Sequence, residues 1–143
     1  MNRALNISEN ELTISSSTNN LTVVREFIES FGKEIQLSKR EISHISLAVD
    51  EACTNIIKHA YKNNKNEKIK IKIKFKNNKL SIKLIDKGYK FDPQIVPEPN
   101  VAESQKNKKG GGLGMFLMKK LMDEVKYKSN GKSNELTLIK YVA

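Results

Sequence analysis

Residues 42–61 read I-S-H-I-S-L-A-V-D-E-A-C-T-N-I-I-K-H-A-Y, the clearest helical pattern in the chain. Apolar residues recur there at helical spacing and form one face that has to be buried. Ser38 followed by Glu41 is a capping-box signature, so a helix is predicted to start there and to run to about Tyr61. The apolar face consists of Ile42, Ile45, Val49, Ala52, Cys53, Ile56 and Ile57.

The other side of this helix carries Glu51, Asn55 and Lys58, which share one stripe through their i, i+4, i+7 spacing. Taken alone, such a stripe is most often the solvated face of an amphipathic helix. Two later segments favour a different interpretation. An Asp-Lys-Gly tripeptide at 86–88 follows an apolar strand, and K-G-G-G-L-G at 109–114 precedes a second amphipathic helix. The three separated signals together indicate one nucleotide site.

The size and composition fit a single domain. A chain of 143 residues can bury a sizeable core, so one domain over 1–143 is expected. The only cysteine, Cys53, lies on the apolar helix face, which favours a core role over a nucleophilic thiol. There is no run of about 18 apolar residues and no signal-peptide pattern. We therefore expect a soluble cytoplasmic protein without membrane contact.

The net charge of +10 raises the possibility of an anionic partner such as nucleic acid. The lysines between 68 and 76 alternate with apolar residues, however, which is typical of the solvated face of a half-buried strand. Aromatic residues are few and are not interleaved with these lysines as a base-stacking surface requires. We expect no direct nucleic-acid binding, and we interpret the lysines as a solubilising face that also keeps a strand edge from pairing.

The predicted elements follow the order strand, two helices, hairpin, long irregular segment, helix and hairpin. The first strand is predicted at 11–16 after a loose segment, and the first helix from about residue 21 to Gly32. This order predicts an α+β fold: a two-layer α/β sandwich with a mostly antiparallel sheet and helices on one face.

The main hairpin is predicted from a regular alternation over 67–76 that resumes at 80–84. Asn77 and Asn78 lie between the two runs and tolerate the positive φ of a tight turn. The second strand of this hairpin therefore delivers Asp86 at its far end.

An irregular segment, approximately 92–112, contains all three prolines and lies between the two glycine signals. Loops of this length in compact domains are often lids, so this segment is predicted to be a lid over the nucleotide site. A last helix is predicted from Leu113, and 125–142 to form a closing hairpin around Asn130 and Gly131.

The candidate residues suit different parts of a nucleotide. Glycines at a helix start let backbone N–H groups approach a phosphate, although such a run alone is equally a flexible hinge. Asp86 could accept a hydrogen bond from an exocyclic amine such as that of adenine, or could be a simple turn carboxylate. Asn55 could provide a neutral oxygen ligand to Mg²⁺, and Glu51 could orient or deprotonate an attacking hydroxyl or water.

Three segments carry a family resemblance. They resemble, in order and spacing, the N, G1 and G2 boxes of the anti-sigma-factor serine/threonine kinases of the RsbW and SpoIIAB type, within the GHKL family of histidine-kinase-like ATPases. The resemblance covers nearly the whole chain and implies a Bergerat ATP-binding fold that binds ATP with Mg²⁺. The segments are E-A-C-T-N-I-I-K-H-A-Y at 51–61, I-D-K-G-Y-K-F-D-P at 85–93, and G-G-G-L-G-M-F-L-M-K-K-L-M-D-E-V-K-Y at 110–127.

The resemblance also implies residue roles. Asn55 corresponds to the magnesium-ligating Asn and Glu51 to the general base. Asp86 corresponds to the adenine-recognising Asp, with Gly88 as its companion, and Lys58 to a basic phosphate contact. The lid and G2 backbone that would contact the nucleotide maps to Gly110, Gly112, Leu113 and Gly114.

One position departs from the family pattern: Lys90 stands where many relatives have a second glycine. A glycine's freedom at positive φ is lost there, so the local turn and the nucleotide affinity are expected to differ. The function implied by the resemblance is phosphorylation of an anti-anti-sigma (STAS) antagonist and sequestration of a sigma factor, with homodimerisation as a family expectation. The alternatives are a nucleotide-dependent protein-binding switch without kinase activity and, further off, a Lys-rich nucleic-acid-binding domain.

Overall fold

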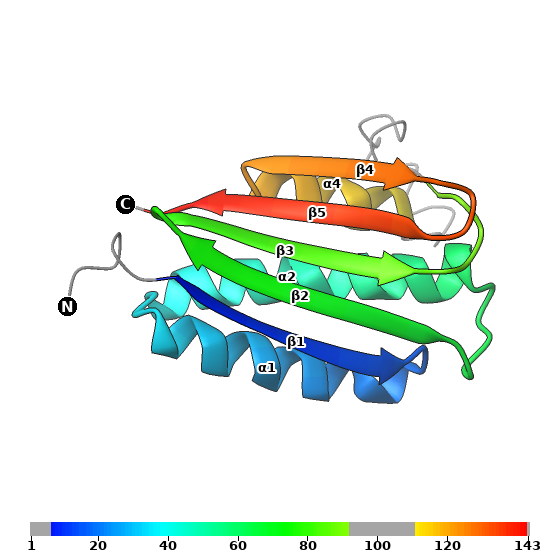
Figure 1. Ribbon diagram of the computed structural model, residues 1–143, viewed down its shortest axis with the longest axis horizontal. Coiled ribbons are helices and arrows are strands. Elements are labelled where there is room, and N and C mark those ends of the chain that lie inside the picture. Colours follow the sequence, from blue (N-terminus) through cyan, green and yellow to red (C-terminus); the bar gives the residue numbers. More distant parts are fainter. Residues whose placement is uncertain (1–6, 92–110, 143) are drawn as a thin grey trace.

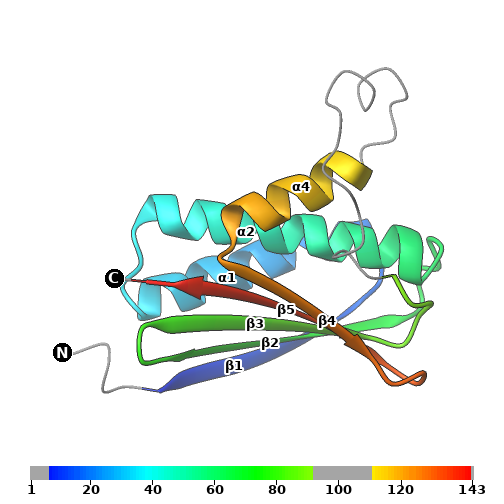
Figure 2. The ribbon, with the colours of Figure 1, turned by 90° about the horizontal axis from the view of Figure 1, so that it is seen from above.

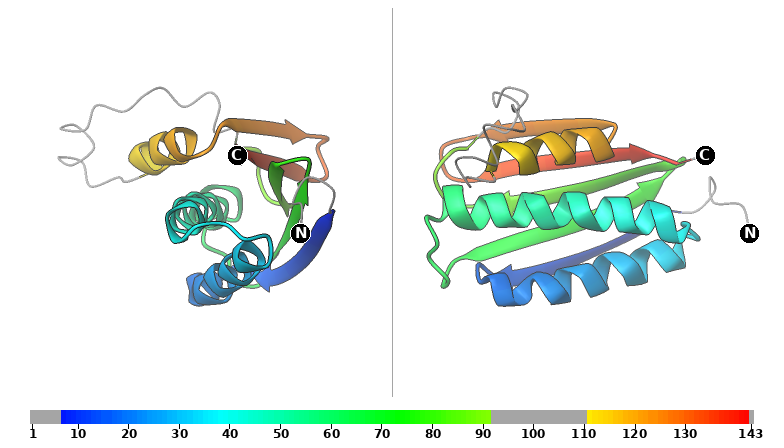
Figure 3. Two further views of the ribbon diagram at one scale, coloured as in Figure 1. Left: turned by 90° about the vertical axis from the view of Figure 1, so that its left-hand side faces the viewer. Right: turned by 180° about the vertical axis from the view of Figure 1, so that it is seen from behind.

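The computed structural model describes residues 7–91 and 111–142 as two layers, a five-stranded sheet and a layer of helices on one of its faces (Figures 1 and 2). The sheet order is β1-β2-β3-β5-β4 and every neighbouring pair is antiparallel, so the predicted α+β sandwich is confirmed. Seen end-on, the sheet curves around the helices (Figure 3, left). The strands are β1 (Ser8–Ser15), β2 (Lys68–Lys76), β3 (Lys79–Asp86), β4 (Glu124–Ser129) and β5 (Asn134–Tyr141).

In the described residues the helical layer contains three α-helices and two short helical turns. Their bounds are α1 (Leu21–Glu34), α2 (Lys39–Asn55) and α4 (Gly111–Leu121), with a 3-10 turn η2 (Thr18–Asn20) and a π-helix η3 (Ile56–Ala60). Helix α2 lies in the middle and packs against both α1 and α4 (Figure 3, right). None of the helices within the described ranges combines the length and apolarity that crossing a membrane requires.

Helix α2 begins where the sequence predicts. The Ser38 hydroxyl accepts a hydrogen bond from the Glu41 N–H at 3.0 Å, and the Glu41 carboxylate accepts one from the Ser38 N–H at 2.8 Å. This reciprocal capping box satisfies two of the N–H groups that a helix start leaves unpaired. The predicted apolar face is buried except at Ile42, which is half-buried, and Ile45, Val49 and Cys53 are essentially inaccessible to solvent.

The end of this helix differs from the prediction of one continuous α-helix to Tyr61. The α-helix ends at Asn55, and a π-turn follows in which the Tyr61 N–H donates to the Ile56 carbonyl at 2.9 Å. The Ala60 carbonyl accepts a hydrogen bond from the Tyr89 N–H at 2.8 Å. A contact with a distant segment thus holds the widened turn, and helical spacing alone does not reveal it.

Two predictions about the N-terminal third were wrong in their boundaries. Residues 8–10, expected to be loose, belong to β1. Gly32, expected to end the first helix, lies inside α1, where a Cβ atom would come within 2.6 Å of Ile42 Cγ1 on α2. This glycine allows two helices to approach closely, and the left-handed residue after the helix is Gln36, with φ 65°.

The main hairpin confirms its predicted turn, since Asn77 and Asn78 have φ of 53° and 60°. Along β2 the lysines are exposed and the intervening Ile69, Ile71 and Ile73 are buried. The prediction that these lysines keep a strand edge from pairing was wrong, however. Strand β2 is interior, and the sheet edges are β1 and β4.

The C-terminal part forms the predicted helix and hairpin, with earlier starts. Helix α4 begins at Gly111 instead of Leu113, so Gly111, Gly112 and Gly114 are part of the helix. Strand β5 begins at Asn134, and the connection from β4 includes Gly131 at φ 86°. The predicted lid, 92–112, lies outside the described residues except for its last two positions.

Candidate functional site

Asn55 and Asp86, far apart in the sequence, line the same cavity between the helical layer and the sheet. Asn55 comes from the end of α2 and Asp86 from the end of β3. The cavity has about 20 Å³ of free volume, room for about one water molecule, so a purine ring enters only when side chains at its mouth move apart. Most of its wall is apolar, including Ala52, Ile56, Ala60, Met118 and Leu136.

Asp86 is a fixed, buried carboxylate, only 4% exposed. Its Oδ1 atom accepts two hydrogen bonds, from the Gly88 N–H at 2.9 Å and from the Asn134 side-chain amide at 2.8 Å. Burial raises the pKa of Asp86 above the usual aspartate range, and these two hydrogen bonds partly oppose that rise. Because Oδ1 takes both donors, Oδ2 is the atom available to accept a hydrogen bond from a bound amine.

Gly88 is required by a close backbone approach. A Cβ atom at this position would lie 2.4 Å from the Ala60 carbonyl oxygen in the π-turn. Tyr61, which follows Ala60 in the chain, also connects the π-turn to the residues after Asp86. Its hydroxyl accepts a hydrogen bond from the Lys87 N–H at 2.8 Å and donates one to the Lys68 carbonyl at 2.5 Å. The turn after Asp86 is therefore locked to the end of the helix that carries Asn55.

Asn134 is a site residue that the sequence analysis missed. It is 3% exposed and is the first residue of β5, directly opposite Asp86 in the β3–β5 ladder. Besides Asp86, its side-chain amide donates to the Gly88 carbonyl at 2.9 Å. In the sequence Asn134 follows a turn and looks like one more loop residue, and only the strand register reveals its partner.

Asn55 is 5% exposed, and its Nδ2 atom has no hydrogen-bond partner within the described part of the chain. A buried amide N–H donor without a partner is costly, which fits a position that an acceptor on a ligand, such as a phosphate oxygen, completes. Within the described residues, no cluster of three or more His, Cys, Asp or Glu side chains could hold a metal by itself. A magnesium ion here would need Asn55 together with phosphate oxygens and water, which is how Mg²⁺ is commonly held.

Glu51 lies one turn before Asn55 on α2 and is half-buried. Its pKa is raised by burial first and by the negative charge of Asp50 second, while the positive charge of Lys58 lowers it. Asp50 in turn pairs with Arg25 of α1 at 3.2 Å. Lys58 is exposed on the π-turn, and its charge acts on Glu51.

Phe91, which lines the cavity, stacks on His59 of the π-turn. Their rings stack with centroids 4.4 Å apart and an interplanar angle of 15°. The Phe91 N–H donates to the Tyr127 hydroxyl at 3.0 Å, and both aromatic residues line the cavity. Burial, followed by Lys62 and Lys58, lowers the pKa of His59, which favours the neutral ring in this stack.

The glycine-rich segment is described only in part. Gly110 lies outside the described residues, whereas Gly112, Leu113 and Gly114 form part of the first turns of α4. The start of α4 lies beside the C-terminal half of α2, as both Figure 2 and the right-hand view of Figure 3 show. Lys90 is exposed and is not among the residues with positive φ, so this turn forms without the freedom of a glycine.

The sequence matches known proteins over most of its length. The family model described as "Histidine kinase-like ATPase domain" matches residues 14–140. The protein named serine-protein kinase RsbW from Staphylococcus aureus is 34% identical over 140 residues, covering 92% of this chain and 86% of the relative. The protein of the same name from Bacillus subtilis is 28% identical, covering 84% and 78%.

Solved structures share the fold at low identity. The RsbU and RsbW domains of a Mycobacterium tuberculosis protein give a TM-score of 0.67 at 18% identity, covering 94% of this chain and 32% of that longer chain. The SiaB–SiaC complex from Pseudomonas aeruginosa gives a TM-score of 0.64 at 13% identity, covering 91% and 88%.

Proposed function

Because the chain belongs to the histidine kinase-like ATPase family, and within it to the serine-protein kinases of the RsbW type, we propose that its cavity binds ATP with Mg²⁺ for phosphoryl transfer to a serine or threonine of a protein antagonist. The observation that carries this proposal is the meeting of Asp86 and Asn55 at one apolar-walled cavity. A small number of oriented polar groups in an apolar pocket is what recognition of a purine base requires.

The base would be recognised by Asp86. Its Oδ1 is held by two N–H donors, so Oδ2 faces an exocyclic amine at little further cost in side-chain entropy. The apolar residues of the wall would exclude water from the ring, which strengthens this hydrogen bond.

The phosphates would lie toward Asn55, Lys58 and the first turns of α4. Asn55 would hold Mg²⁺, and the ion would neutralise charge on the phosphates when bound. Lys58, exposed on the π-turn, would add a positive charge on the same side. The backbone N–H groups of Gly112, Leu113 and Gly114 at the positive end of α4 suit an anion.

Glu51 would act as the general base. It lies one helical turn from Asn55, close to where the transferred phosphoryl group would be, and would accept the proton of the attacking hydroxyl. Its raised pKa brings the carboxylate nearer to the working pH and makes it a stronger proton acceptor.

The protein substrate would be an anti-anti-sigma factor of the STAS class, and in another state the kinase would sequester a sigma factor and so regulate transcription by partner switching. The names of the RsbW relatives support the kinase assignment. A domain spanning 1–143 that works in the cytoplasm as a homodimer would complete this proposal, and the family match over 14–140 is in keeping with a single domain.

The proposal is tested by nucleotide calorimetry and by label transfer from radioactive ATP to a purified STAS-domain antagonist from the same genome. Asn55→Ala is expected to weaken Mg²⁺-ATP binding by about a hundredfold, because a buried polar contact is lost. Asn66→Ala, in the loop before β2, is the matched control and should bind as the unaltered protein does. ATP binding without any phosphoprotein would instead support the nucleotide-dependent switch, and undiminished binding by Asn55→Ala would contradict the assigned site.

A further inference from the structure

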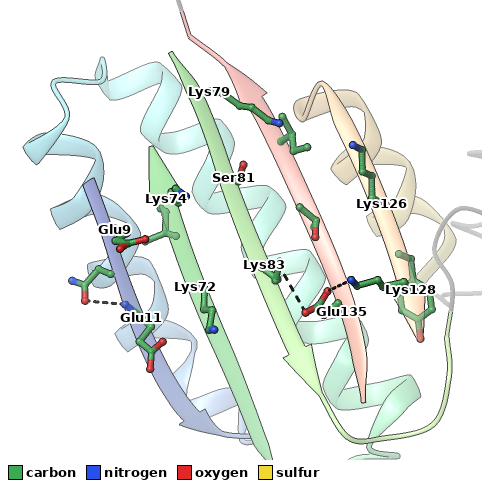
Figure 4. Close-up of a pocket in the computed structure, with 15 residues that line it drawn as sticks. Glu9, Glu11, Lys72, Lys74, Lys79, Ser81, Lys83, Lys126, Lys128 and Glu135 are labelled. Carbon is green, nitrogen blue, oxygen red and sulfur yellow. Dashed lines mark hydrogen bonds and ion pairs between the residues drawn. The ribbon is translucent and has the colours of Figure 1, made fainter. Parts of the chain in front are cut away.

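The face of the sheet that the helices leave uncovered is hollow and rich in lysine (Figure 4). The hollow, here called the lysine groove, encloses about 860 Å³ and runs from β1 across to β4. It lies on the side of the sheet opposite the helices, which are seen behind the strands in the close-up (Figure 4). Its walls carry Lys72, Lys74, Lys79, Lys83, Lys126 and Lys128.

The positive charge of the groove is not balanced within the fold. Three glutamates line it, Glu9, Glu11 and Glu135, against six lysines. Glu135 pairs with Lys128 at 3.4 Å and only loosely with Lys83 at 4.0 Å. Glu9 and Glu11 stand opposite lysines in the β1–β2 ladder, but no ion pair joins them to those lysines in the described chain (Figure 4).

Like charges also face each other across strands. Lys72 on β2 lies directly opposite Lys83 on β3 in the antiparallel register. Such a pair is destabilising, because the two ammonium groups are neighbours on one face. An anionic group placed between β2 and β3 would remove this repulsion, so the sheet itself favours a negatively charged occupant.

The floor of the groove is small and partly apolar. Ser81 and Thr137 line it, together with Ile139. Ile139 is 2% exposed although it is on the face away from the helices and is not part of the main core cluster. Five strands spaced by about 4.8 Å span roughly 19 Å, enough for one helix of about 10 Å diameter to lie along the hollow.

From these features we infer that the lysine groove is a docking surface for an acidic helical segment of a partner protein. Carboxylates of the segment meet the unpaired lysines, and the segment lies over the small side chains of Ser81 and Thr137. A nucleic acid carries a charge on every phosphate and so must pass the groove glutamates, whereas a peptide whose carboxylates are spaced apart can avoid them, which disfavours a nucleic acid. A second copy of this chain is disfavoured because it would bring two lysine-lined faces together.

The inference is tested with a fluorescein-labelled helical peptide of glutamate, alanine and leucine, about 20 residues long, by fluorescence anisotropy. Lys72→Gln combined with Lys79→Gln removes two groove charges that form no ion pair in the described chain. Lys33→Gln combined with Lys39→Gln removes the same charge from α1 and α2 on the other face. We expect the groove variant to bind the peptide about tenfold more weakly and the control to remain within about twofold.

Every other result counts against the inference. If the peptide does not bind, or if its affinity falls equally in the groove variant and the control variant, the groove is a solvated surface without a docking role. Tighter binding of an oligothymidylate or of phosphatidylglycerol vesicles, lost in the groove variant, would assign it to another anion. If sedimentation equilibrium shows a dimer, and only the groove variant dimerises more weakly, the lysine groove would be the contact surface with a second copy of this chain. ATP calorimetry on the groove variant, expected to be unchanged, keeps these outcomes separate from the proposed kinase function.

Discussion

Asn134 donates a hydrogen bond to Asp86 at 2.8 Å, joining the first residue of β5 to the last residue of β3 beside the cavity that Asp86 lines. The same amide reaches the Gly88 carbonyl at 2.9 Å. One side chain therefore orients the carboxylate and also holds the turn that follows it. Since Asp86 is buried, its carboxylate cannot replace Asn134 by water without a change in the structure.

Asn134→Ala should remove both hydrogen bonds, leaving Asp86 with one donor and the Gly88 carbonyl with none from this side chain. We expect the free energy of unfolding to fall by about 1–3 kcal/mol and adenosine affinity to fall about tenfold. Urea unfolding and calorimetry measure the two effects.

Asn10→Ala, on the exposed side of β1, is the control and should change neither quantity by a measurable amount. A stable Asn134→Ala protein with unaltered adenosine affinity would show that Asp86 is oriented without this amide.

Adenosine binding should depend on pH through Asp86. The pKa of this carboxyl is raised in the folded protein, so protonation begins at a higher pH than for an ordinary aspartate. Protonated Asp86 loses an acceptor, and affinity should fall as the pH drops through the raised pKa. Asp86→Asn should bind about a hundredfold more weakly at neutral pH and lose this pH dependence. Adenosine is the suitable ligand because it has no phosphates that titrate.

Gly88→Ala should destabilise the protein by at least about 2 kcal/mol, because the new Cβ would meet the Ala60 carbonyl at 2.4 Å. Gly131→Asn is the matched control: nothing lies within 4 Å of a Cβ there, and asparagine tolerates the positive φ of 86°. Thermal unfolding compares the two. Equal melting temperatures would mean that the junction between the π-turn and residue 88 yields easily.

Glu51→Gln should lower the rate of phosphoryl transfer by about a hundredfold or more while ATP affinity stays within about twofold. The amide keeps the size of the side chain but cannot accept the proton of the hydroxyl. Single-turnover label transfer gives the rate and calorimetry the affinity. Glu34→Gln, at the end of α1, provides the control for loss of a carboxylate far from the cavity.

The pH dependence of that rate should move in opposite directions in two variants. The charge of Asp50 raises the pKa of Glu51 and that of Lys58 lowers it. Asp50→Asn should therefore shift the acidic limb of the rate profile to lower pH, and Lys58→Gln should shift it to higher pH. Shifts of the same sign in both variants would exclude Glu51 as the group that titrates.

Features that depend on neighbouring residues could be predicted from the sequence. The capping box of Ser38 and Glu41 is one such feature, because its two hydrogen bonds join residues three apart. The turn at Asn77 and Asn78 is another, since these residues adopt positive φ readily. Asn55 and Asp86 were brought together by family resemblance, and the structure places both at one cavity.

Features that depend on distant residues could not be predicted. The π-turn at Ile56–Ala60 is joined to the segment after β3 by the bond from Tyr89 to Ala60, and Gly32 is explained by its approach to Ile42 on the next helix. Asn134 required the β3–β5 register. The alternation along β2 predicts the buried face correctly, but it contains no information about strand order and so does not show that β2 is an interior strand.

The alternation along β2 also separates two roles residue by residue. Ile69, Ile71 and Ile73 build the interior, while the lysines between them project to the opposite side. Exchanging a lysine therefore leaves the packing beneath the helices unchanged. Related kinases encoded in one genome can therefore differ in the side chains of this outer surface, and so in the partner proteins that they bind. Their buried residues and the proposed nucleotide site would stay the same.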